Sequence, residues 1–529
     1  MSKRALSLLL AAAALFLCAS CAGPDAPDPL DPPVEYSPPV PATPVRVVDS
    51  QFTVRYDPDA SFNPITGTSA NNMALTPLLY EGLFVLNERF EAEPVLCESY
   101  STDDGLTYTF IIKSGVLFSD GTELSSRDVK YSLEQAKLSG RFKGRLARVA
   151  GIETPDTRTV VITLSLPHGR LPVLLDVPII KSGTISSSCP PGTGPYALDE
   201  TGEAPRLVAS RFYRDPDTAP VDVIYLGSCS DAQLPARFLA QEIDLFWSDP
   251  GGDKNLRLTP DHDAWYYNTS ILEYVGFNVR SDILSHTAFR RAIGLAVNRE
   301  EIVEEVLGGH AIAAPLALSP KHPLYDGAWV TPVKDVSSEI SAIFAEIGLE
   351  DFNSDGYLEY PGAGGASQPF VLSLLVHDQA HKVAAAEKIT DALMSIGINV
   401  ELVKLPWESY LKALEKGQFD LYLADVYLPA DFDLTALLAP GGALDYGRAG
   451  SEEYGEAIAA FLAARGEENE ASAARELCAL IEQNAPIIPV LYRQYAVHIG
   501  RNIAKGVRPT QSSIFYNLSN WTIALGASG

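Results

Sequence analysis

Strand-like and helix-like hydrophobic patterns alternate along the chain from residue 51 onward. The stretches FTVRYD (52–57) and TYTFIIK (107–113) carry β-branched and aromatic residues in partial period-two alternation, which predicts strands. After the second strand the chain turns at 119–121, and Ser125 with Asp128 has the spacing of a capping box. Three apolar residues then share one helical face: Val129, Leu133 and Ala136.

Helical spacing is clearer in the second half of the chain. Five residues between 289 and 297 repeat at helical intervals: Phe289, Ala292, Ile293, Ala296 and Val297. Asn298 with Glu301 predicts the start of a following helix. The helical pattern of 381–397 ends on Gly397 and runs directly into the strand-like stretch 398–405. A helix, a glycine and a strand in this order form an α/β crossover unit, so we expect a multi-lobed α/β protein.

The first residues predict export from the cell. Lys3 and Arg4 precede the apolar run 5–17, which is too short to cross a bilayer because a spanning helix needs about 20 residues. Cys21 at the cleavage point resembles a bacterial lipobox and would become the acylated first residue, although Cys18 occupies a position where that pattern prefers leucine. Ordinary secretion with Cys21 as a plain thiol is the alternative. We expect a lipoprotein signal peptide over 1–21.

Proline and aspartate dominate the segment that follows. Residues 22–45 show no apolar periodicity that could build a core, so an extended and disordered chain is expected there. We interpret 22–50 as a disordered tether, which a lipid-anchored protein needs between the membrane and its globular body.

Composition narrows the class of protein. A net charge of −27 argues against nucleic acid and anionic lipid as partners, and 46% hydrophobic residues suffice for large buried cores. About 480 residues after the tether are enough for two or three lobes. Cys97 and Cys478 sit in apolar contexts typical of buried thiols, whereas Cys189 and Cys229 lie in loop-like stretches and could form a disulfide outside the cell.

Several motifs in a fixed order resemble the family 5 extracellular solute-binding proteins, the oligopeptide-, dipeptide- and nickel-binding components of ABC importers. They cover roughly residues 51–500: LYEGLF (79–84), PVLCESYSTDDGLTYTFIIKSGVLFSDGTELSSRDVKYSLEQA (94–136), GTGPYAL (192–198), FLAQEIDLF (238–246), YVGFNVRSDILSHTAFRRAIGLAVNREEIVEEVLGG (274–309), GINVELVKLPWESYLKALEKGQFDLYLAD (397–425) and NAPIIPVLY (484–492).

The resemblance implies an α/β, bilobal periplasmic-binding-protein-like fold of type II, the Venus-flytrap kind, with an extra domain inserted in the first lobe. It places the inserted domain at 88–197 and the second lobe at 277–486. The first lobe is then assembled from the pieces 51–87, 198–276 and 487–529. Such receptors close over a solute by a hinge motion between the lobes.

The resemblance also implies a function. We expect a protein outside the cytoplasm, anchored by Cys21, monomeric, without cofactor, metal or catalysis, that delivers its solute to ABC permease subunits with cytoplasmic ATPases. Peptide is the first choice of ligand; a nickel-type metal chelate or another small cationic solute is the alternative. A sensor or chaperone role without transport is a second alternative. The motifs G-x-S-x-G, H-E-x-x-H and G-x-x-x-x-G-K are absent from the sequence.

Candidate ligand-binding residues follow from the resemblance. Trp407 stands between a strand and a helix, where peptide-binding members place a tryptophan that lines the cleft; a core tryptophan is the alternative. Thr66 and Thr68 belong to a stretch resembling the first-lobe loop that reaches the ligand. Tyr492 and Arg493 fall where members contribute an aromatic residue from the returning strand.

The acidic stretch LADVYLPADFDL (423–434) is the most informative departure from the family pattern. Peptide-binding members carry a run resembling G-W-x-A-D-Y here, in which the aspartate pairs with the α-ammonium of the peptide. This chain has Val426 in place of the tryptophan and Pro429 in place of the aspartate, with Tyr427 between them. Either Asp425 or Asp431 takes over the amine contact, or the ligand differs from an ordinary peptide. Asp433 would serve as the comparison.

Two stretches have partial metal-site spacing. Residues 351–362 resemble a calcium loop, but Gly362 stands where the bidentate acid should be, so we favour a solvated turn. His377 and His381 have the i, i+4 spacing that can place two imidazoles on one helical face, and we favour solvated residues there too.

Overall fold

The computed structural model describes residues 51–252, 256, 258, 262–361 and 367–525. The predicted signal peptide with Cys21 and the predicted tether lie outside these residues. Within the described part of the chain, no helix combines the length and the apolar character needed to cross a membrane.

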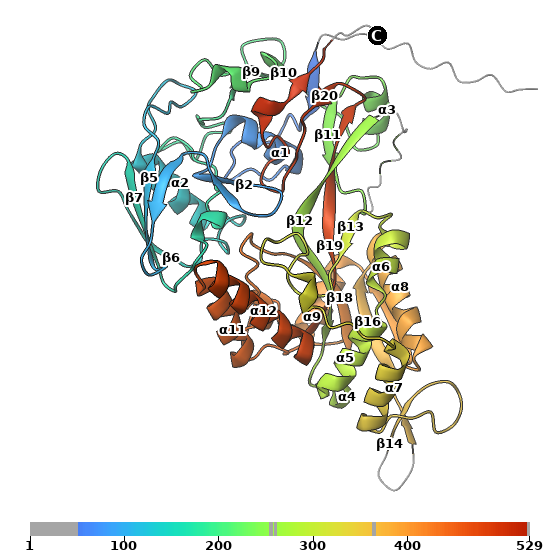
Figure 1. The fold of residues 1–529 in the computed structure, drawn as a ribbon. Helices are drawn as coiled ribbons and strands as arrows, with labels where there is room; N and C mark the ends of the chain where they lie inside the picture. The colour runs from blue at the N-terminus through green and yellow to red at the C-terminus, as the bar shows by residue number, and fades with distance from the viewer. Residues whose placement is uncertain (1–50, 253–255, 257, 259–261, 362–366, 526–529) are drawn as a thin grey trace, which may run out of the picture. The chain divides into compact units, whose positions relative to one another are not determined.

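One mixed sheet runs through the body of the protein, and two long antiparallel strands, β12 and β19, form its middle (Figure 1). Its order is β17 (Val400–Leu405), β16 (Leu372–His377), β18 (Leu421–Tyr427), β12 (His262–Phe277), β19 (Ile487–Gly500), β11 (Leu245–Ser248), β1 (Phe52–Arg55), β10 (Val223–Gly227), β9 (Arg206–Ala209) and β8 (Tyr196–Asp199), with β13 (Ala311–Ala313) also paired to β19.

Both long strands serve both lobes. The first part of β12 pairs with the end of β19, which continues to β11 and β1 of the first lobe. The last part of β12 pairs with β19 on one side and with β18 on the other, and β18 continues to β16 and β17 of the second lobe. The register between β12 and β19 shifts between Asn268 and Leu272, at the passage from one lobe to the other.

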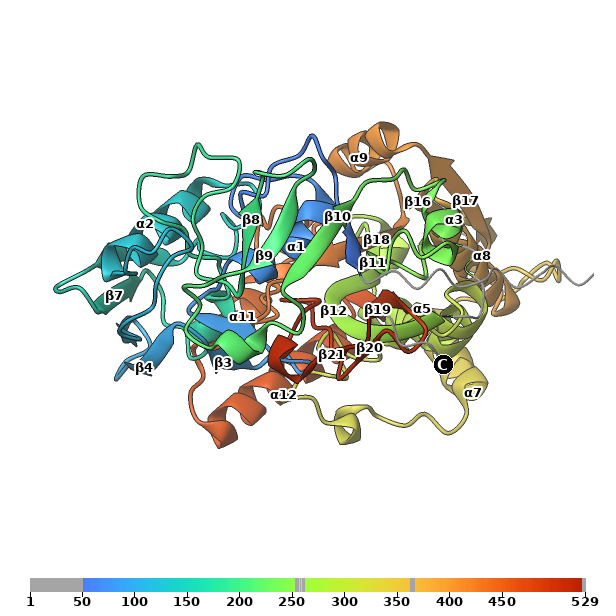
Figure 2. The same ribbon diagram turned by 90° about the horizontal axis from the view of Figure 1, so that it is seen from above.

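The first lobe packs the helix α1 (Ala70–Leu79) against its strands. The predicted strand at 52–57 is confirmed as β1, which runs parallel to β10. Figure 2 shows β8, β9 and β10 beside one another with α1 nearby. The helix begins at Ser69, whose side chain accepts a hydrogen bond from the Asn72 amide.

The segment predicted as an insertion has a sheet and a core of its own. Its strands are β4 (Cys97–Ser101), β5 (Thr107–Ile112), β7 (Thr159–Leu164) and β6 (Val149–Glu153), covered by α2 (Ser126–Leu138), with the hairpin β2 (Phe84–Leu86) and β3 (Ala92–Pro94) alongside. The predicted capping box is confirmed, because the Asp128 carboxylate accepts from the Ser125 amide at 2.9 Å. The predicted helical face is buried: Val129, Leu133 and Ala136 are at most 1% exposed.

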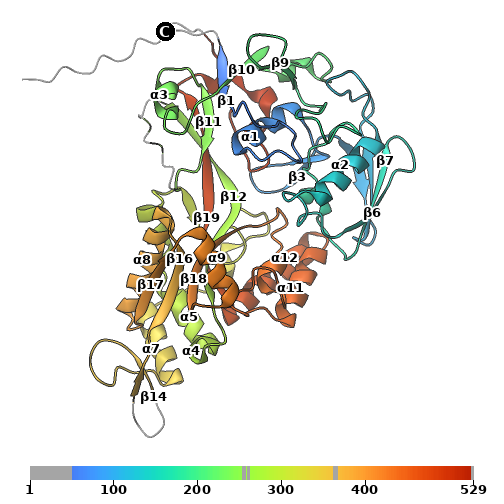
Figure 3. The same ribbon diagram turned by 180° about the vertical axis from the view of Figure 1, so that it is seen from behind.

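The second lobe contains the crossover unit predicted from 381–405. Strands β16 and β17 are parallel and joined by α8 (Ala380–Ser395), and Gly397 adopts φ +87° after the helix. Helices α8 and α9 (Trp407–Lys416) flank these strands (Figure 3). The helix predicted after Asn298 is short: α6 (Arg299–Glu301) passes into a π-helical turn, η3 (Ile302–Val306).

Other helices complete the second lobe, and shorter elements are spread over the described chain. The helices are α4 (Asp282–Ser285), α5 (Thr287–Ala296), α7 (Val336–Ile347), α10 (Thr435–Leu438), α11 (Glu452–Ala463) and α12 (Glu467–Asn484). The shorter elements are α3 (Leu234–Leu239), β14 (Glu359–Pro361), β15 (Ser367–Pro369), β20 (Ala504–Lys505), β21 (Thr522–Ile523), η1 (Leu171–Leu174), η2 (Pro216–Thr218), η4 (Gly327–Trp329) and η5 (Leu518–Asn520).

The cysteines follow the sequence-based expectation in part. Cys97 and Cys478 are buried thiols, as predicted. The disulfide considered between Cys189 and Cys229 is not formed, since both thiols are free. Cys189 lies 3.4 Å from the Tyr80 hydroxyl, whereas Cys229 packs against a separate small core around α3.

Candidate functional site

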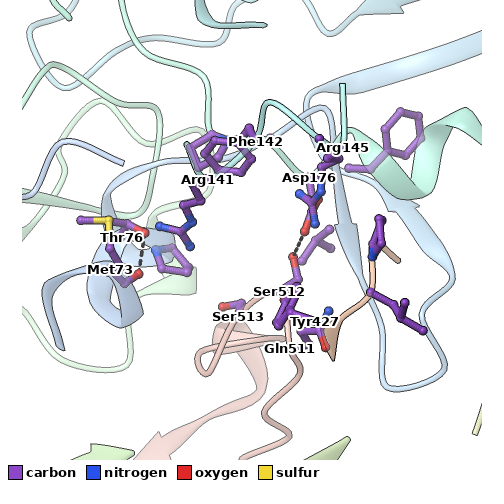
Figure 4. Close-up of a pocket in the computed structure, with 18 of the residues that line it drawn as sticks. Met73, Thr76, Arg141, Phe142, Arg145, Asp176, Tyr427, Gln511, Ser512 and Ser513 are labelled. Atoms are coloured by element: carbon purple, nitrogen blue, oxygen red, sulfur yellow. Dashed lines mark hydrogen bonds and ion pairs between the residues drawn. The ribbon is translucent and has the colours of Figure 1, made fainter. Parts of the chain in front are cut away.

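A cavity of about 1230 Å³ opens between α1, the inserted segment and the end of β18. Figure 4 shows its walls: Met73 and Thr76 come from α1, Arg141 and Arg145 from the segment after α2, and Ser512 and Ser513 from the C-terminal part. Residues 426–429, which the sequence singled out, line it on the second-lobe side. The volume is large enough for a ligand of drug size or more.

The α1 wall is fixed from beneath by a single asparagine. The buried Asn72 side chain accepts from the Asp57 amide at 2.8 Å and donates to the carbonyls of Asp57 and Ala60 at 3.0 and 2.9 Å. These bonds tie the first turn of the helix to the preceding loop. Met73, Thr76 and Tyr80 therefore face the cavity from a rigid element.

Each carboxylate that lines this cavity already has partners. Asp176 binds Arg145 at 2.5 Å and accepts from the Ser512 hydroxyl at 2.9 Å, and Glu81 accepts two bonds of 2.7 Å from Arg214. Glu93 accepts from the Tyr516 hydroxyl at 2.6 Å, and Asp433 lies 3.5 Å from Arg148. The acids therefore organise the walls of the cavity.

Tyr427 extends into the cavity from the end of β18, and its side chain is 56% exposed. Withdrawal of the phenol from bulk water raises the pKa of Tyr427, while the positive charges of Arg145 and Arg141 lower it. At neutral pH the hydroxyl is therefore a neutral donor. Pro429 lines the same cavity, without a carboxylate, at the position where the family pattern has its amine-binding aspartate.

A second cavity, of about 440 Å³, is lined by Asp425 and Arg493. Asp425 is paired with Lys382, whose side chain is only 7% exposed. Arg493 donates two bonds of 2.6 Å to Asp249, and a third of 2.9 Å to the Nε2 atom of His381. Burial raises the pKa of Asp425, but Lys382 and Arg493 together bring it below its ordinary value.

The other two aspartates of the acidic stretch are committed to internal contacts. Asp431 is 3% exposed and lies 2.8 Å from the Nε2 atom of His168. Burial raises its pKa, but His168 and Arg170 together hold it below the ordinary value. Asp433 accepts from Thr435 as well as facing Arg148. None of the three aspartates thus presents an unpaired carboxylate to a ligand amine.

The remaining predicted site residues, Trp407, Thr66, Thr68 and Tyr492, are not among those that line either cavity. Trp407 begins α9, is 52% exposed, and lies with its ring centroid 5.1 Å from that of His377. Thr66 and Thr68 are exposed in the loop before α1. Tyr492 is 1% exposed, and its hydroxyl donates to the Ala317 carbonyl at 2.7 Å, so it belongs to the core of the second lobe.

Sequence reasoning missed several charged residues at these cavities. Glu273 is 1% exposed beside the smaller one, and neither of its carboxylate oxygens has a hydrogen-bond partner. Burial raises its pKa to about 7 against the opposing effect of Arg493 and Lys382. Glu273 pairs with Asp425 in the β12–β18 register, a contact visible only after pairing is known. The sequence offered one clue to these charged residues, because Lys382 directly follows His381, which the sequence analysis had considered.

In the two stretches with partial metal-site spacing, the structure arranges the side chains differently from what the spacing suggested. Asp351, Asp355 and Glu359 bring carboxylate oxygens within 4.8 Å of one another, so the third acid is Glu359, which the calcium-loop spacing did not indicate. These acids accept from backbone amides of their own turn, including those of Phe352 and Gly356. His377 ends β16 whereas His381 lies on α8, so the two do not share a helical face.

Comparison with known proteins identifies the family of this chain. The model of the bacterial extracellular solute-binding proteins, family 5 Middle, matches residues 91–443. A curated relative, the glutathione-binding protein GsiB of Escherichia coli K12, is 27% identical over 293 residues, which are 52% of this chain. The chain spans about half the length of the curated relatives it matches, 56% in this case.

Solved structures support the fold. The oligopeptide-binding protein AppA from Bacillus subtilis, in complex with a nonapeptide, has a TM-score of 0.63 at 20% identity, covering 90% of this chain and 99% of that one. NikA from Brucella suis, in complex with Fe(III)-EDTA, has a TM-score of 0.71 at 20% identity, covering 90% and 100%. These likenesses confirm the predicted bilobal, periplasmic-binding-protein-like α/β fold, and the chain belongs to family 5 of the bacterial extracellular solute-binding proteins.

Proposed function

We propose that this chain is the substrate-binding component of an ABC importer, capturing a short peptide between its lobes and delivering it to the permease without catalysis of its own. The observation that carries the proposal is the 1230 Å³ cavity, walled by elements of both lobes and of the inserted segment. A cavity shared between lobes joined by two strands suits a receptor that closes on its ligand.

The predicted site residues have different roles in this proposal. Tyr427 would contact the ligand in the larger cavity, and Asp425 with Arg493 would contact a part that reaches the smaller one. Trp407, Thr66 and Thr68 line neither cavity, and they would reach the ligand only on closure of the lobes, with side chains that are exposed before it. We assign Tyr492 a supporting role beneath the site.

Native mass spectrometry of gently purified protein tests the ligand class. Peptides that co-purify across preparations support the proposal. A metal chelate recovered without peptide would favour the nickel-type alternative, which the likeness to NikA keeps open. Uptake of labelled peptide by a deletion strain separates transport from a sensor or chaperone role, since only a transport component is needed for uptake.

We also infer that Cys21 carries a lipid anchor and that 22–50 is the tether, with the protein held outside the cytoplasm. The support is the sequence alone: a positive start, a short apolar run, and a cysteine at the cleavage point. Cys21→Ser protein should leave the membrane fraction and run at a different mass. Membrane retention at the parental mass would defeat the lipid anchor.

A further inference from the structure

Three of the eight histidines gather on one face of the central sheet, where β12 begins and β19 ends (Figure 1). His262 and Tyr266 share a face of β12, because side chains alternate along a strand. His498 pairs with Ala264 in the strand register and so points to the same face. The His310 ring stacks on that of Tyr266, with the two centroids 4.7 Å apart. None of the three histidines lines either cavity.

Two of these imidazoles face each other through their ring nitrogens. The Nδ1 atom of His498 lies 3.1 Å from the Nε2 atom of His262, and the ring centroids are 5.1 Å apart. Zinc binds histidine nitrogens at about 2.0–2.1 Å, so two nitrogens on one tetrahedral ion lie about 3.3–3.4 Å apart. The centroids of two such rings are about 5.2 Å apart. The pair therefore needs to shift by only about 0.3 Å to hold one ion between its nitrogens.

The neighbouring side chains hold both rings in this orientation. The Ser248 hydroxyl lies 2.8 Å from the Nε2 atom of His498. When Nε2 carries the proton and donates it to the Ser248 oxygen, Nδ1 presents a lone pair toward His262. Histidines that bind metals usually have such an outer partner, which fixes the ring and its tautomer. Phe246 stacks on the His498 ring with centroids 4.8 Å apart, and Phe238 meets the His262 ring edge-on at 5.7 Å.

The buried member of the pair is in the form that binds a metal ion. Burial and the nearby His262 and His310 lower the pKa of His498 to about 3, so its imidazole is neutral at physiological pH. Neutral imidazole is the form that coordinates metals. His498 is 6% exposed, whereas His262 is only half-buried. Solvent and a dissolved ion therefore reach the pair from the side of His262.

Other buried histidines of the protein show what a structural arrangement looks like. His168 is bonded to the carboxylate of Asp431, and His322 to the guanidinium of Arg170. Each of these two thus joins a charged partner from a distant part of the chain. His498 instead faces a second imidazole, and a pair of imidazole nitrogens is a ligand set that suits zinc and copper(II).

We propose that the Nδ1 atom of His498 and the Nε2 atom of His262 together bind one zinc or copper(II) ion, outside the cavities that would hold the transported solute. Water completes the coordination, because within the described residues the pair belongs to no group of three histidine, cysteine or acidic side chains within 4.8 Å of one another. The ion would tie the start of β12 to the end of β19.

This inference does not depend on the proposed solute-binding function. The sequence-based expectation of a protein without metal could not anticipate the pair, since 236 positions separate its two members. Its one link to the ligand cavities is Ser248, which holds His498 and also lines the second cavity.

The test is a calorimetric titration with zinc chloride of the mature protein, first freed of metal with a chelator. We expect one zinc ion per molecule. Ser248→Ala should weaken binding about 10-fold, since loss of an outer partner of a metal ligand costs about 10–100-fold. His262→Gln and His498→Gln each remove a ligand itself and should weaken binding about 100-fold or more. His286→Gln is the matched control, because His286 is exposed before α5, and it should bind zinc like the parent.

Modification by diethylpyrocarbonate, mapped by mass spectrometry, gives a second readout: zinc should protect His262 and leave His286 reactive. Urea unfolding without metal shows which variants are folded, and His262→Gln, at the half-buried position, decides the outcome if His498→Gln does not fold. Parental zinc affinity in folded His262→Gln puts the ion elsewhere, for instance at Asp351, Asp355 and Glu359, and overturns the inference. A parent that binds no zinc at millimolar concentration overturns it as well.

Discussion

Glu273 is a buried acid whose charge lacks hydrogen bonds, and its position makes stability depend on pH. Its pKa of about 7 in the folded protein lies above the ordinary 4.5, so the folded state holds the proton more tightly than the unfolded chain. Proton binding by Glu273 therefore contributes fully to the stability of the folded state below pH 4.5, and this contribution is lost as the pH rises through 7. We expect Glu273→Gln to unfold in urea like the parent at pH 4.5 but to be about 1–3 kcal/mol more stable at pH 8.

Glu456→Gln is the matched control, because Glu456 is exposed on α11. It should change the free energy of unfolding by at most about 0.5 kcal/mol at both pH values. An unchanged pH dependence in Glu273→Gln would show that the Glu273 carboxylate is solvated by water that enters the second cavity.

The pair between Asp425 and Lys382 supplies a different residue-scale prediction. Asp425→Asn leaves the Lys382 ammonium, 7% exposed, without its partner. Breaking a buried pair costs about 3–5 kcal/mol, but Asp425 is 35% exposed, so water screens part of the effect. We expect a loss of about 1–3 kcal/mol in urea unfolding at pH 7 without any ligand. Lys382→Met should recover part of that loss in the double variant.

Glu305→Gln provides the exposed comparison for that experiment. Its ion pair with Lys388 lies at the surface, where Glu305 is 60% exposed, so a change of about 0–1 kcal/mol is expected. If Asp425→Asn behaved like this surface variant, Asp425 would be available to a ligand amine and the first interpretation of the acidic stretch would regain its support.

At the scale of elements, the inserted segment meets the second lobe through a glycine. The Gly169 amide donates to the Leu462 carbonyl near the end of α11 at 2.7 Å, and a Cβ at this position would lie 1.7 Å from the Ala464 carbonyl oxygen. Gly169→Ala must therefore push the loop away from α11. We expect a loss of about 2–3 kcal/mol in thermal or urea unfolding.

Gly151→Ala is the control, since a Cβ there meets nothing within 4 Å. It lies in β6 of the same segment and should change stability by less than about 1 kcal/mol, because alanine reduces the entropy of the unfolded chain. Equal effects of the two substitutions would mean that the loop around Gly169 adjusts freely.

Local patterns predicted the elements of this fold where neighbouring residues decide the structure. Ser125 with Asp128 marked the start of α2, and Gly397 marked the passage from α8 to β17, because capping and left-handed turns depend on residues a few positions apart. The pairing of His168 with Asp431 joins residues 263 positions apart, and no local pattern contains it.

The whole molecule is held in its present arrangement by contacts between the inserted segment and the second lobe. His168 and Asp431 are both nearly fully buried at this contact, and Arg170 reaches the Nε2 atom of His322 at 2.9 Å. Opening of the cleft on this side must separate these pairs and expose them to water. The contact therefore stabilises the arrangement seen in this structure.

We expect His168→Gln and Asp431→Asn each to destabilise the protein by about 3–5 kcal/mol, because each leaves a buried polar partner unsatisfied. In the double variant the losses should not add, with a coupling of about 0.5–3 kcal/mol. Hydrogen exchange should rise first at 165–175, where the segment leaves the second lobe.

The pKa of Asp431 lies below 3.8, so its contribution to stability is present above that pH and is lost as the pH falls through the lower value. The same region should therefore lose protection in acid, and additive losses with unchanged local exchange would contradict a coupled contact between the lobes.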